Sequence, residues 1–97
     1  MDLSQIRERI DLLDRQIAEL LTERMDITRE VADYKRKNNL PVYHPERERQ
    51  VIQKVKNLTK EEYQEALAVI YQCIMEESKK NQNRILEESH KESCEAL

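Results

Sequence analysis

The chain of 97 residues has no glycine, tryptophan or phenylalanine, and it has only two prolines. Glycine is the usual residue in tight hairpin turns, so its absence argues against a sheet-rich fold. The two prolines, Pro41 and Pro45, lie close together and mark the one loop that we expect. The sequence therefore predicts a single small domain of the all-α class.

Cysteines, long apolar runs and an excess of positive charge are also scarce or absent. Cys73 and Cys94 have the spacing of neither a disulfide framework nor a metal site, so we interpret both as reduced and inert. No apolar run is long enough to span a membrane and no signal-peptide pattern opens the chain, which predicts a cytoplasmic protein without membrane contact. Charges of both signs are interspersed, with a net charge of −3, and this pattern argues against nucleic-acid binding.

The first third of the chain carries the apolar pattern of a long helix that packs against other helices. Ten positions follow an unbroken alternation of steps of three and four residues, and all but one are apolar: Leu3, Ile6, Ile10, Leu13, Ile17, Leu20, Arg24, Ile27, Val31 and Tyr34. A helix over residues 3–37 is roughly 50 Å long, whereas a globule of this size is about 30 Å across. The rest of the chain covers only part of this helix, so we expect an antiparallel homodimer.

Two further helices are expected after the loop. The second begins at Pro45, which suits a first helical turn, and ends near Asn57. Its apolar side consists of Val51, Ile52, Val55 and Leu58. Thr59 and Glu62 are typical of a capping box that opens a third helix. The expected buried stripe of that helix is Tyr63, Leu67, Ile70 and Ile74. We expect the domain to cover residues 1–90, its end already polar from Glu87, and a polar tail over 91–97.

The single arginine in the apolar pattern, Arg24, places a permanent charge where a leucine would be less costly. Lys35 lies eleven residues further on and is nearly eclipsed with Arg24, about 16 Å along the helix axis. Arg7 is about 25 Å from Arg24, too far for one small ligand to touch both on the same helix. An antiparallel copy that crosses near Ile17 would bring the partner's Arg7 between Arg24 and Lys35.

Polar residues also lie on the inward sides of the other two helices. The apolar direction of the second helix turns Arg47 and Glu48 toward the core, and Ser78 and Gln82 are one turn apart beside the buried stripe of the third. Taken singly, each has an ordinary interpretation, such as an ion pair between Arg24 and a nearby carboxylate. Together they suit a pocket for a small dicarboxylate in which charge builds on an oxygen near donor side chains.

Motifs for other kinds of chemistry are absent from the sequence. There is no Cys-His or Ser-His-Asp set, no glycine-rich phosphate loop and no cluster with metal-ligand spacing. The two histidines, His44 and His90, are isolated. The sequence therefore argues against covalent, nucleotide-dependent and metal-dependent chemistry.

Five segments occur in order along the chain: IRERIDLLD at 6–14, LLTER at 20–24, VADYK at 31–35, PV at 41–42 with RER at 47–49, and ES at 77–78 with Gln82. Together they resemble the all-helical type II class of chorismate mutases, and the resemblance covers about residues 3–85. It implies an intertwined dimer of three-helix protomers. It also implies the Claisen rearrangement of chorismate to prephenate in aromatic amino acid biosynthesis, with no cofactor.

By this resemblance, the partner's Arg7 and this chain's Arg24 would hold the two substrate carboxylates. Lys35 and Gln82 would donate hydrogen bonds to the ether oxygen as its bond breaks, and Glu48 would accept one from the ring hydroxyl. Further contacts to the carboxylates and the pocket would come from Arg47, Ser78 and the backbone N–H of His44.

Two alternatives stay open at this point. An isochorismate-pyruvate lyase has the same fold and a cationic pocket, but Glu48 argues against it, because the corresponding position looks apolar in the lyases. A non-catalytic helical dimerisation or regulatory module is the other alternative. The intact set of charged residues argues against it, since a pure scaffold would gain stability from leucine in place of Arg24. Where relatives often have aspartate, this chain has His44, which is the one visible departure from the pattern.

Overall fold

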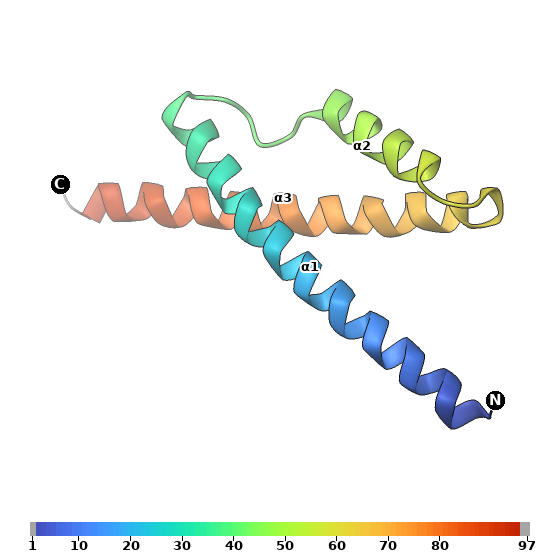
Figure 1. Ribbon diagram of the computed structural model, residues 1–97. Coiled ribbons are helices and arrows are strands. Elements are labelled where there is room, and N and C mark those ends of the chain that lie inside the picture. Colours follow the sequence, from blue (N-terminus) through green and yellow to red (C-terminus); the bar gives the residue numbers. More distant parts are fainter. Residues whose placement is uncertain (1, 96–97) are drawn as a thin grey trace.

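The computed structural model describes the backbone of residues 2–95 and the side chains of residues 2–88. It contains α1 (Leu3–Lys37), α2 (Pro45–Asn57), a short 3-10 helix η1 (Glu61–Tyr63) and α3 (Gln64–Glu95) (Figure 1). The all-α prediction and the predicted bounds of the first two helices are confirmed. The polar segment from residue 87 to residue 95 continues α3. The Cys94 side chain lies outside the described residues, and Cys73 is an exposed free thiol.

Both ends of α1 are closed by local hydrogen bonds. At the start, the Asp2 carboxylate accepts from the Gln5 N–H at 2.9 Å, and the Gln5 side chain accepts from the Asp2 N–H at 3.1 Å, which is a capping box. At the end, Asn39 has a left-handed backbone with φ of 55°. The Leu40 N–H donates to the Lys35 carbonyl at 2.8 Å, as in a Schellman motif. Asparagine thus takes the place that glycine usually fills, in a chain without glycine.

The start of α2 is set by two adjacent residues. Pro45 occupies the first helical position, where its missing N–H leaves no hydrogen bond unmade. His44 is the N-cap, because its Nδ1 atom accepts from the Arg47 N–H at 3.3 Å. This capping role of the His44 imidazole was not expected from the sequence.

The predicted capping box at Thr59 and Glu62 is wrong. The Thr59 N–H donates to the Lys56 carbonyl at 3.3 Å, so Thr59 still belongs to the closing turn of α2. The chain then forms η1 with Lys60 as its N-cap, and no side chain caps it. Gln64 instead links the two helices, since its Nε2 atom donates to the Lys56 carbonyl at 2.9 Å.

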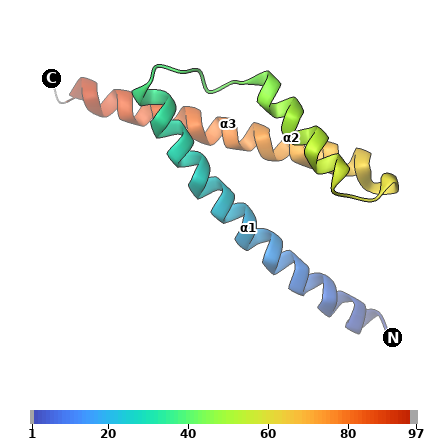
Figure 2. The same ribbon diagram turned by 45° about the horizontal axis from the view of Figure 1, so that its top comes forward.

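The three α-helices form an open, elongated arrangement of 64 × 28 × 15 Å. The C-terminal half of α1 crosses α3, and α2 lies beside the first part of α3, while the N-terminal half of α1 extends away from both (Figures 1 and 2). Within the described residues, the only buried apolar side chains are Ala32 and Met75. None of the helices described is both long and apolar enough to cross a membrane.

Much of the apolar pattern of α1 is uncovered in the single chain. Large apolar side chains along this helix stay exposed, for example Leu13 at 56% and Leu20 at 63%. This is the face that the sequence led us to expect in a homodimer. The arrangement of two copies is not part of the structure, so the intertwined dimer stays a prediction.

Three residues of the predicted apolar sides of α2 and α3 need correction. Tyr63 and Ile70 are about half exposed, at 49% and 52%, and Leu58 is 78% exposed, so none of them is core in this chain. The inward line of α3 runs instead through Met75, Ser78 and Gln82. These positions follow the same helical spacing but are rotated from the predicted stripe, because α3 carries a second apolar side that nothing in the single chain covers.

The capping role of His44 predicts a loss of stability when its side chain is removed. His44→Ala should lower the free energy of unfolding by about 0.5–2 kcal/mol, because the Arg47 N–H loses its acceptor. His44→Asn, which keeps an acceptor, should stay near wild type. Urea unfolding at one fixed protein concentration measures both. An alanine variant as stable as the wild type would contradict this role.

Candidate functional site

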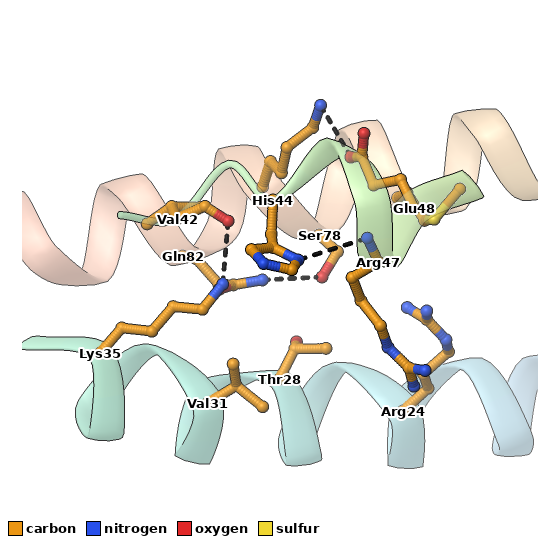
Figure 3. Close-up of a pocket in the computed structure, with 12 residues that line it drawn as sticks. Arg24, Thr28, Val31, Lys35, Val42, His44, Arg47, Glu48, Ser78 and Gln82 are labelled. Carbon is orange, nitrogen blue, oxygen red and sulfur yellow. Dashed lines mark hydrogen bonds and ion pairs between the residues drawn. The ribbon is translucent and has the colours of Figure 1, made fainter. Parts of the chain in front are cut away.

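One cavity of about 130 Å³ lies where the C-terminal half of α1, the start of α2 and the middle of α3 meet (Figure 3). It is lined by Arg24, Thr28, Val31, Lys35, Val42, His44, Arg47, Glu48, Met75, Ser78, Lys79 and Gln82. Every predicted site residue except Arg7 lies on this wall. Residues from three helices and one loop, far apart in the sequence, therefore meet as predicted.

Arg7 does not line this cavity. It belongs to the N-terminal half of α1, which extends away from the rest of the chain (Figure 1). Within one chain it is therefore separate from the other candidate residues. Its contribution through a partner copy stays a prediction.

Lys35 is anchored by the loop that precedes α2. Its Nζ atom donates to the Val42 carbonyl at 2.9 Å, and the side chain reaches from α1 toward Gln82 in Figure 3. An ammonium group carries three donors, so two remain for a ligand. The loop carbonyl thus fixes the position of the cation without neutralising its charge.

Ser78 and Gln82 form the buried polar wall of the cavity, at 4% and 6% exposed. The Gln82 Nε2 atom donates to the Ser78 Oγ atom at 3.2 Å, and Gln82 Oε1 has no hydrogen-bond partner among the described residues. With the amide rotated by half a turn, the Ser78 hydroxyl donates to Oε1 and leaves the N–H₂ group as a free donor. Either way one polar group of this neutral pair is available to a ligand.

Arg24 and Arg47 extend toward each other from α1 and α2 (Figure 3). The Arg24 guanidinium lies 6.0 Å from the centre of the Tyr71 ring, and its buried Nη1 atom has no partner among the described residues. No carboxylate within residues 2–88 of the same chain forms an ion pair with either arginine, so the structure shows no ion pair of Arg24 within the chain. Two converging cations without a counter-charge favour an anionic ligand.

Glu48 is held by a residue that the sequence analysis missed. The Lys79 Nζ atom lies 2.9 Å from Glu48 Oε1 and 2.9 Å from Glu76 Oε1, and 4.6 Å from the centre of the Tyr43 ring. Its hydrogen bonds to Glu76 and to Glu48 raise the pKa of Lys79, and the same contact with Lys79 lowers the pKa of Glu76. Lys79 directly follows Ser78, so helical spacing indicates that it is near the cavity but does not indicate its contacts with Glu48 and Tyr43, which lie on other elements.

Comparisons with known proteins identify relatives of this chain. The family model for chorismate mutase type II matches residues 6–83. The chorismate mutase of Methanocaldococcus jannaschii is 34% identical over 89 residues, which are 90% of this chain and 90% of that protein. The bifunctional chorismate mutase/prephenate dehydratase of Aquifex aeolicus is 40% identical over 79 residues, 76% of this chain and 22% of that protein. A protein of the same name from Buchnera aphidicola is 33% identical over 87 residues.

The chain spans less than a quarter of the length of these two bifunctional relatives, 22% and 23% respectively. No solved structure matches it. The fold and the cavity define an all-helical protein with a cationic, amide-lined site for a small anion. With the family match over most of its length, the chain belongs to the chorismate mutase type II family.

Proposed function

We propose that this chain acts as a chorismate mutase in the cytoplasm and converts chorismate to prephenate in the biosynthesis of aromatic amino acids. The observation that carries this proposal is the convergence of Arg24, Arg47 and Lys35 on one cavity in which no carboxylate of residues 2–88 forms an ion pair with either arginine. Chorismate carries two carboxylates, and planar guanidinium groups bind carboxylates through paired hydrogen bonds.

The rearrangement needs positioning and charge stabilisation rather than proton transfer. The ether C–O bond of chorismate breaks while a new C–C bond forms within the same molecule, and negative charge builds on the ether oxygen. Lys35 and Gln82 supply donors to that oxygen: the Val42 carbonyl fixes Lys35, and the Ser78 hydroxyl holds Gln82 in the amide orientation in which Oε1 accepts from it and the N–H₂ group is free. Donors already held in place stabilise the developing charge without reorganising during the reaction.

Glu48 accepts a hydrogen bond from the ring hydroxyl of the substrate. A carboxylate has about four acceptor positions, and the contact with Lys79 at Oε1 uses one of them. Arg24 holds one substrate carboxylate, while Arg47 and the backbone N–H of His44 complete the contacts. Glu48 is also the residue that favours a mutase over the isochorismate-pyruvate lyase alternative.

The active unit is a homodimer in this proposal. The exposed apolar face of α1 supports it, and so does an apolar groove of about 460 Å³ between α1 and α3, lined by residues such as Leu21, Met25 and Ile74. An antiparallel second copy covers apolar surface and brings the partner's Arg7 to the cavity, where it binds the other substrate carboxylate.

The direct test is conversion of chorismate by the purified protein. Wild type should consume chorismate and form prephenate, and Lys35→Ala and Gln82→Ala should each lower kcat/KM by about a hundredfold or more, because each removes a donor to the ether oxygen. Chorismate absorbance together with prephenate detection measures this. Lys37→Ala, an exposed lysine of the same helical turn that lies off the cavity, is the matched control. Intact chorismate but pyruvate from isochorismate would favour the lyase instead.

A mixing experiment tests the shared site. Arg7→Ala and Lys35→Ala proteins should each be inactive, yet refolding them together should restore activity, because a mixed dimer has one site with both residues intact. Random association of equal amounts gives about a quarter of the wild-type site concentration. No recovery, in mixtures shown by mass spectrometry to contain mixed dimers, would contradict a site completed by the partner's Arg7.

A further inference from the structure

Glu48 shares the cavity wall with several cationic side chains. It lies on the same cavity wall as Arg24 and Arg47, and either guanidinium would be a strong partner for its carboxylate. Instead it pairs with Lys79 at 2.9 Å. In Figure 3 the carboxylate of Glu48 points away from the guanidinium groups of Arg24 and Arg47. The acid in the cavity lining is thus paired with Lys79 and not with either arginine.

Lys79 is itself firmly held. Glu76 contacts its ammonium group at 2.9 Å from one turn away on the same helix, and the centre of the Tyr43 ring lies 4.6 Å from its Nζ atom. Lys79 and Glu48 are 19% and 17% exposed, whereas the neighbouring pair of Lys80 and Glu77 is 72% and 67% exposed. Solvent screens the inner pair much less than the outer one. An ammonium fixed from two sides can hold Glu48 in one position.

We propose that Lys79 is a positioning residue that keeps Glu48 from neutralising the anion-binding arginines. Without it, the Glu48 carboxylate turns to Arg47 or Arg24 and competes with the substrate carboxylate for the same donors. The contact also leaves Glu48 fixed as an acceptor for the substrate hydroxyl. This inference rests on the proposed mutase function, and it assigns to Lys79 an effect that reaches the substrate only through Glu48.

The prediction is a change in KM rather than in kcat. Lys79→Met, which keeps the length of the side chain but removes its charge, should raise KM about tenfold and change kcat by less than about threefold. Lys79→Arg should restore most of the loss, since it keeps a cation between the two carboxylates. Lys80→Met, the matched control on the exposed neighbouring pair, should leave both constants unchanged. Steady-state kinetics with chorismate measure all three variants.

A double-mutant comparison tests whether the effect of Lys79 on KM depends on the Glu48 carboxylate. In a Glu48→Gln background the neutral amide no longer competes for a guanidinium, so Lys79→Met should not raise KM further. An equal rise in KM in both backgrounds would mean that Lys79 contacts the substrate itself and would overturn the proposal. Unchanged KM in Lys79→Met alone, with normal wild-type turnover, would overturn this inference and leave the mutase function intact. A wild type without turnover would overturn both.

Discussion

The crossing of α1 over α3 is the constraint on which the rest of this structure depends. It places Arg24 and Lys35, about three turns apart on one helix, against the buried Ser78 and Gln82 of another. The loop then adds the Val42 carbonyl that anchors Lys35. A cavity built at such a crossing needs no sheet and no long loop, because three helices supply most of its wall and one short loop supplies the rest.

The crossing also brings positively charged side chains together, and this lowers the stability of the fold. Arg24 is half-buried, has an unpaired Nη1 atom among the described residues and faces Arg47. Leaving a buried cation without a partner destabilises a fold. Arg24 nevertheless has no such partner among the described residues, and the nearby acid Glu48 pairs with Lys79 instead. The result is a site whose electrostatics are completed by an anionic ligand rather than by the protein itself.

The strongest features of the sequence predicted the fold well. The steps of three and four residues in the first third predicted the full length of α1, and Pro41 and Pro45 marked the loop because the backbone preference of proline is specific. The inward-facing polar residues of the three helices predicted the cavity. A charge on an apolar face requires a partner or a ligand, and this holds for any element that packs against that face.

The sequence predictions that were wrong or incomplete share a physical cause. Helical periodicity shows that α3 has an apolar side, but it does not show which neighbour covers that side, so Ile70 was predicted as core and is 52% exposed. The Thr59 capping box failed because the closing turn of α2 had already engaged its backbone N–H. Lys79 was missed because its contacts with Glu48 and Tyr43 join different elements, and no local spacing contains such contacts.

The measurement that tests the central claim most directly is the stability and turnover of Arg24→Leu. If Arg24 is held without a protein partner for the sake of a ligand, its replacement should abolish prephenate formation. The free energy of unfolding should be equal to that of the wild type or up to about 4 kcal/mol higher. A variant that loses stability, or one that keeps wild-type turnover, would contradict the account and make Arg24 a structural residue.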